Sequence, residues 1–188
     1  MKRKDSIRVN LFVYGGGEDV PPLATEIRVR EVPDPIIVIQ DREMGGFTCY
    51  EALTTGNSLH GYGLVIQDNN LLFMLDRYFY HALWPTGRVV YRENKPLSLP
   101  KEYIHIRELV SDLREFKLQN PPCVEVFGRF VRSGKPVHLV GKIVDFYEDE
   151  GKVISNVTVE TEDGKRYVVG GWNASLEDIE ADRIVLFG

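Results

Sequence analysis

Histidine and cysteine side chains are the groups in this sequence best suited to metal binding or nucleophilic catalysis. The histidines are His60, His81, His105 and His138, and the cysteines are Cys49 and Cys123. No pair follows a zinc-ligand spacing such as H-x-x-x-H or C-x-x-C, so we expect no metal site and no cofactor. The sequence favours a protein without catalytic activity; a small enzyme with a pocket around His60 and His81 is an alternative.

The stretch LLFMLDRYFYHALWPTG, residues 71–87, concentrates aromatic and basic side chains. If Asn70 caps a helix that ends before the proline, then Arg77, His81 and Trp84 align on one face. If the flanking D-N-N and W-P-T-G segments are turns, the stretch is a β-meander. Tryptophan and arginine are enriched at binding hot spots, so the three aligned side chains are a candidate recognition patch. Packing between the two halves of the chain is the competing interpretation.

Two more places carry candidate binding residues. Trp172 follows two glycines, and we expect that replacing either Trp172 or Trp84 by alanine lowers capture of the partner without unfolding the protein. Arg129, Arg132 and Lys135 cluster around a predicted turn, where they could touch the phosphates of a nucleic acid. The net charge of −5 argues against a dedicated nucleic-acid binder, because phosphate backbones are bound mainly by clustered Lys and Arg.

An amphipathic helix is the clearest element among those that must position these side chains. It spans about residues 101–118, and its apolar face has the helical spacing of three and four: Ile106, Leu109, Val110, Leu113 and Phe116. Pro121 and Pro122 cannot continue a helix, so a boundary is predicted there. The expected organisation is an α+β N-terminal domain, residues 1–120, and a second domain, residues 121–188.

After the double proline the hydrophobic period changes from helical to alternating. Five short strands are predicted, at about 123–131, 137–147, 153–161, 166–169 and 184–187. Glu162-Asp163-Gly164 is the strongest hairpin signal between them. A sheet this small must close to protect its edges. The layout resembles an SH3-like small barrel, with a helical turn at Leu176–Ala181 before the last strand, and the resemblance implies a shape only.

The part before the helix is predicted to be rich in β-strands. Strands are expected at about 7–14, 23–32, 36–39 and 62–67. The glycines at positions 15–17 are interpreted as a plain turn, because no Lys-Ser or Lys-Thr of a phosphate-binding loop follows them. The fold class is therefore α+β, with a β-rich first part, one clear helix and a small C-terminal barrel.

Composition narrows the function further. The 188 residues are 43% hydrophobic and 27% charged, which is ordinary for a globular protein. No apolar run approaches the roughly 18 residues of a membrane span, and two cysteines suit the reducing cytoplasm. The sequence favours a cytoplasmic binding or adaptor protein whose partner is another protein. Association with a nucleic acid through the basic turn is the second hypothesis, and the small enzyme is the third.

Overall fold

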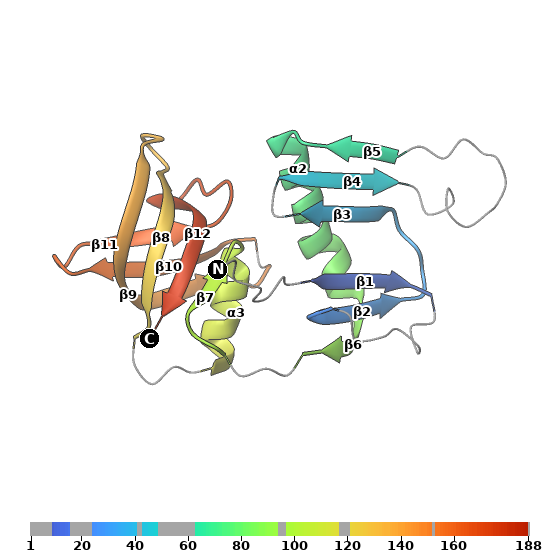
Figure 1. The fold of residues 1–188 in the computed structure, drawn as a ribbon, viewed down its shortest axis with the longest axis horizontal. Coiled ribbons are helices and arrows are strands. Elements are labelled where there is room, and N and C mark those ends of the chain that lie inside the picture. Colours follow the sequence, from blue (N-terminus) through green and yellow to red (C-terminus); the bar gives the residue numbers. More distant parts are fainter. Residues whose placement is uncertain are drawn as a thin grey trace, which may run out of the picture. The chain divides into compact units, whose positions relative to one another are not determined.

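The computed structural model describes residues 9–15, 24–40, 43–48, 63–93, 97–116, 121–151 and 153–187. The chain divides into two compact units, Met1–Asn94 and Lys95–Gly188. Strands predominate in both units and each contains a helical segment, so the predicted α+β class is confirmed (Figure 1). Within the described ranges, no helix is both long enough and apolar enough to cross a bilayer.

The first unit contains two three-stranded sheets. One sheet has β2 at its centre, parallel to β1 and antiparallel to β6: β1 Asn10–Tyr14, β2 Glu26–Arg30 and β6 Arg88–Arg92. The other is an antiparallel meander with β4 at its centre: β3 Ile36–Gln40, β4 Met44–Thr48 and β5 Gly63–Ile66. The N-terminal part is therefore β-rich, as the alternating pattern predicts.

The stretch at residues 71–87 is helical, which decides between the two interpretations of it. It comprises α2 Asn69–Arg77, a π-helical turn Tyr78–Leu83 and a 3₁₀ turn Trp84–Thr86. The N-cap is Asp68 rather than Asn70, because the Asp68 carboxylate accepts the backbone N–H groups of Asn70 and Leu71 at 3.1 and 3.0 Å. Leu72 and Leu83 are the buried side chains of the segment.

The second unit is a closed barrel of five strands. These are β8 Cys123–Phe130, β9 Pro136–Glu148, β10 Ser155–Thr161, β11 Arg166–Gly170 and β12 Ile179–Phe187. The antiparallel order is β11–β10–β9–β8–β12, and a short parallel pairing of β11 with β12 closes the ring. The predicted SH3-like barrel is confirmed. The last strand begins at Ile179, so the end of the segment predicted as a helical turn belongs to β12.

The predicted helix at about 101–118 is shorter than expected. Residues Lys101–Tyr103 form a strand, β7, that pairs with the free edge of β12, and α3 spans Ile106–Phe116. Pairing with β12 satisfies backbone groups that a helix would otherwise have to satisfy. Asp112 of α3 joins the two elements, because its carboxylate accepts the Tyr103 hydroxyl at 2.7 Å and binds the Lys101 ammonium.

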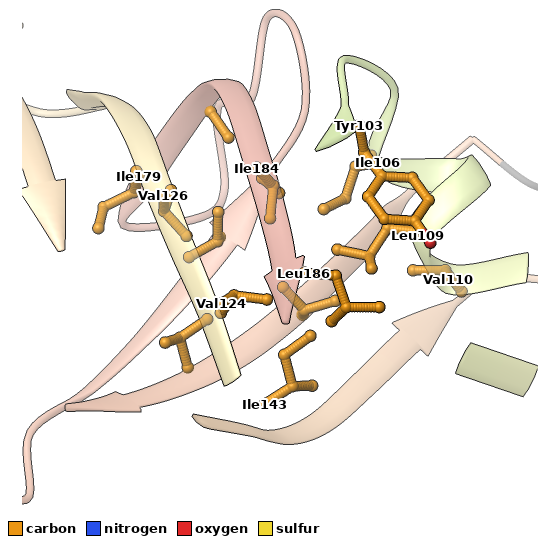
Figure 2. Close-up of a cluster of buried hydrophobic side chains, with 14 of the residues drawn as sticks. Tyr103, Ile106, Leu109, Val110, Val124, Val126, Ile143, Ile179, Ile184 and Leu186 are labelled. Atoms are coloured by element: carbon orange, nitrogen blue, oxygen red, sulfur yellow. The ribbon is translucent and has the colours of Figure 1, made fainter. Parts of the chain in front are cut away.

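Helix α3 is part of the barrel core. Its apolar face is buried in one cluster with inward-facing side chains of the strands: Ile106, Leu109, Val110 and Leu113 with Val124, Val126, Ile143, Val157 and Leu186 among others (Figure 2). The division between the two compact units falls at residues 94 and 95. The boundary predicted at residue 121 therefore lies inside the second unit, between α3 and β8.

Candidate ligand-binding site

The loop from Gly171 to Asp178, which joins β11 to β12, is folded tightly onto its surroundings. A Cβ atom at Gly170 would lie 2.8 Å from the Ala174 Cβ and from the Glu177 side chain. A Cβ atom at Gly171 would lie 2.7 Å from the side chain of Ile106, at the start of α3. Only glycine permits both approaches, so the G-G pair lets the backbone just before Trp172 pack against the beginning of the helix.

Hydrogen bonds within the loop fix its path. The Ala174 N–H donates to the Gly171 carbonyl at 3.0 Å, and Asn173 between them has a left-handed φ of 58°. The Glu177 carboxylate accepts the N–H groups of Ser175 and Leu176 at 3.2 and 3.1 Å. The loop therefore presents the half-buried Trp172 from a pre-formed backbone.

A buried carboxylate connects this loop to β8. Arg129 donates from Nε and Nη2 to the two oxygens of Glu180, both at 3.0 Å, and the Glu180 side chain is only 7% exposed. Glu180 also accepts the N–H of Asn173 at 3.0 Å. Glu180 thus links the predicted residue Arg129 to the backbone of Asn173, the residue after Trp172. The Arg129 guanidinium is therefore already paired with a carboxylate of the protein itself.

The other two residues of the predicted basic turn are exposed. Arg132 lines a cleft of about 280 Å³ together with Phe130, Ser133, Tyr167 and Asp178. Lys135 does not line this cleft, and its backbone N–H donates to the Ser133 hydroxyl oxygen at 3.4 Å. Sequence reasoning missed Tyr167, Asp178 and Glu180, because closure of the barrel brings them to the turn from distant positions.

The candidate patch in the first unit is arranged differently from an aligned helical face. The Arg28 guanidinium lies over the Trp84 ring, 4.7 Å from its centroid, and donates to the Trp84 carbonyl at 3.0 Å. Arg77 lies over the Phe73 ring at 5.4 Å, and His81 is half-buried in the π-helical turn. Trp84 therefore packs on β2, and a recognition role for Arg77 and His81 stays a prediction.

Ionisable groups of the first unit have altered pKa values. Burial alone would raise the pKa of Asp34, but hydrogen bonds from Arg30 and Tyr78 outweigh it and hold that pKa below its ordinary value. Burial raises the pKa of Tyr14 to about 12; the negative charge of Asp34 adds to the effect and the positive charge of Arg30 opposes it. The neutral tyrosine is thus the form that the fold accommodates.

The free energy of unfolding should fall at alkaline pH as Tyr14 ionises. The pKa of Tyr14 is higher in the folded chain than its ordinary value of 10.0. The contribution of the neutral Tyr14 side chain to the free energy of unfolding is therefore complete below pH 10 and is lost as the pH rises towards about 12. We expect Tyr14→Phe to lose less stability than the unmodified protein over this interval. Unfolding midpoints measured from neutral to strongly alkaline pH check this. Parallel losses in the two proteins would contradict it.

Metal-ligating groups are not clustered in the part of the chain described. Within those residues, no three His, Cys, Asp or Glu side chains are grouped as metal ligands would be. Cys123 is half-buried on β8 with a free thiol. Cys49 and His60 lie outside the described residues, so the structure does not describe the pocket of the small-enzyme hypothesis.

Each of the two parts of the chain matches a known family model. Residues 1–91 match the family model described as "Transcriptional regulator TrmB", EBD N-terminal subdomain. Residues 98–187 match the model described as TrmB/TrmBL1, EBD C-terminal subdomain. The two matches correspond closely to the two compact units of the structure. The two halves of the chain are thus similar, in order, to the two EBD subdomains of the TrmB family.

One curated protein with a described role is similar to this chain. The chain is similar to the "HTH-type sugar sensing transcriptional regulator TrmBL1" of Pyrococcus furiosus, with 31% identity over 130 residues. The alignment covers 66% of this chain and 36% of that regulator, so the chain spans about a third of the length of its relative. The prediction of a protein-binding adaptor is wrong, because these matches are to transcription regulators. The nucleic-acid hypothesis agrees with them better.

Proposed function

We propose that this chain is the effector-binding part of a DNA-binding transcription regulator in the cytoplasm, and that its effector is a sugar. The observation that carries the proposal is the match to both EBD subdomains, in order, along nearly the whole chain. The relative described as sugar sensing indicates the class of effector.

Sensing, rather than contact with DNA, is the role that the described residues suit. Helices α2 and α3 are separated by β6 and β7, so they do not form the adjacent helix pair of a helix-turn-helix motif. The net charge of −5 is unfavourable near a phosphate backbone. Within the basic turn, the exposed Arg129 is already paired with the Glu180 carboxylate, so only Arg132 and Lys135 are exposed cations outside this ion pair.

The β11–β12 loop is the place where we expect a sugar to bind. A sugar ring has apolar C–H faces and a rim of hydroxyl groups, so its site needs an aromatic surface and a few well-placed hydrogen-bonding groups. The loop offers the Trp172 ring, and the Glu177 and Glu180 carboxylates bind backbone N–H groups of the same loop. Because the loop is fixed by its own hydrogen bonds, little ordering is required on binding.

Calorimetric titration of the chain with a panel of neutral mono- and disaccharides tests this function. We expect saturable binding of at least one sugar, and a loss of affinity of at least about tenfold in Trp172→Ala, the change typical of a binding hot spot. Trp172→Phe keeps an aromatic face and should retain part of the affinity. Arg88→Ala, at an exposed position of β6 that belongs to no candidate site, is the control and should bind normally.

Two results would count against the proposal. Failure of every sugar in the panel to bind would remove the assignment of the effector, while the matches to the two EBD subdomains would stand. Equal affinity of the unmodified protein and a folded Trp172→Ala variant would remove the loop as the site. Circular dichroism of each variant separates lost binding from lost folding.

A further inference from the structure

A cleft at one end of the barrel lies beside the candidate effector loop but does not include Trp172. Its walls come from the end of β8, the β8–β9 turn, the start of β11 and the residue before β12: Phe130, Arg132, Ser133, Tyr167 and Asp178. The Phe130 and Tyr167 rings are 6.1 Å apart and inclined at 58°, and both pack against the barrel core. The cleft is thus a small space of about 280 Å³ with an aromatic wall.

Asp178 is the most firmly fixed polar group of this cleft. Its backbone N–H donates to the Val168 carbonyl, and its backbone carbonyl accepts the N–H of Val131, both at 2.9 Å. Its carboxylate accepts the Val168 N–H through Oδ2, also at 2.9 Å. These three bonds use only one carboxylate oxygen, so Oδ1 can accept a hydrogen bond from a ligand hydroxyl.

Arg132 supplies a positive charge at the mouth of the cleft. It is exposed, and among the described residues it makes no ion pair, in contrast to Arg129 on the same hairpin. Ser133 beside it accepts the Lys135 N–H and still has its hydroxyl hydrogen to donate. The cleft therefore combines a guanidinium, a hydroxyl, a fixed carboxylate and two aromatic rings.

We propose that this cleft is a second ligand site, distinct from the one at Trp172 although Asp178 ends the same loop, and that it binds a small polyhydroxylated carboxylate such as a sugar acid. A guanidinium binds a carboxylate through two parallel, charge-assisted hydrogen bonds. The rings face the apolar side of the ligand, and Asp178 and Ser133 bind its hydroxyls. The negative charge of Asp178 disfavours a doubly charged phosphate more than a singly charged carboxylate.

Titration of the whole chain with glucuronate, galacturonate and gluconate at low ionic strength tests this site. We expect at least one of them to bind saturably, and Arg132→Gln to weaken that binding by about tenfold or more, as the loss of a charged hydrogen bond does. Lys135→Gln removes the same charge from the same turn without touching the cleft, and it should bind like the unmodified protein. Both positions are exposed, so both variants should fold.

The variants also separate this site from the effector site. Trp172→Ala should lose neutral sugars and keep the sugar acid; loss of both would place the acid at the Trp172 loop and overturn the second site. Equal effects of Arg132→Gln and Lys135→Gln would show attraction to overall charge and overturn it too. Absence of binding by all three acids would remove the site without affecting neutral sugars. Tighter binding of glucose 6-phosphate than of any acid would refute the preference for a carboxylate.

Discussion

A fragment that begins at Pro121 is expected to remain unfolded, whereas a fragment of residues 95–188 is expected to fold on its own. The difference between them is β7 and α3. Tyr103 of β7 is buried in the barrel core, and so are the four apolar side chains of α3: Ile106, Leu109, Val110 and Leu113. At about 2 kcal/mol for each buried side chain, the loss of the four helix side chains alone removes roughly 8 kcal/mol. Domains of this size are stable by only about 5–15 kcal/mol, so the barrel strands alone should not hold together.

Circular dichroism and the dispersion of amide proton signals in NMR spectra of the two fragments check this expectation. A longer fragment with the substitution Ser111→Ala, on the exposed side of α3, serves as a control for changes in the helix and should fold normally. If residues 121–188 gave the spectrum of a folded barrel, the helix would be a covering element rather than part of the core. That result would favour the boundary predicted from the double proline.

Gly128→Ala is expected to have the largest effect of any single methyl group added to the barrel. The new Cβ would lie 2.0 Å from the Glu180 carbonyl oxygen and 2.9 Å from the Ala181 Cα, so two backbones would have to separate. The change falls next to the irregularity in the β8–β12 pairing between Ala181 and Arg183. We expect a loss of about 3 kcal/mol or more in the free energy of unfolding, the upper range for overpacking.

Gly46→Ala is the matched control, because it adds the same atom to a strand that has room for it. The nearest atom to a Cβ there is the Leu64 carbonyl oxygen, at 3.8 Å. Since alanine has less backbone freedom to lose than glycine, a gain of about 0.5 kcal/mol is expected. Hydrogen exchange of the β8 and β12 amides measures the effect on the barrel. Similar exchange in Gly128→Ala and the unmodified protein would contradict the prediction.

Local patterns in the sequence predicted those elements that local residues determine. The five barrel strands follow from alternation, and the turn at residues 162–164 follows from its acidic residues and glycine. The start of α3 was placed too early, because Lys101–Tyr103 pair with the edge of β12, more than eighty positions away. For residues 71–87, aromatic composition and helical spacing pointed to different structures, and the Asp68 cap favours the helix.

The site was predictable only where a residue type is unusual by itself. Trp172 after two glycines and the cations around residue 132 could be selected in this way. Their acidic neighbours could not, because Asp178 and Glu180 reach the β8–β9 turn only when β12 closes the barrel. The similarity to transcription regulators was missed for a related reason: a site that binds a ligand without reacting with it needs no catalytic spacing, so no sequence motif indicates it.

The parallel pairing that closes the barrel involves only two residue pairs, Val169–Ile179 and Gly170–Glu180. Such a short seam is the easiest place for the cylinder to open, since few backbone bonds must break together. The loop that carries Trp172 spans this seam from one strand to the other. A ligand bound to the loop would therefore hold β11 and β12 together at their short pairing. Binding should be detected first as slower hydrogen exchange of the amides in these two residue pairs.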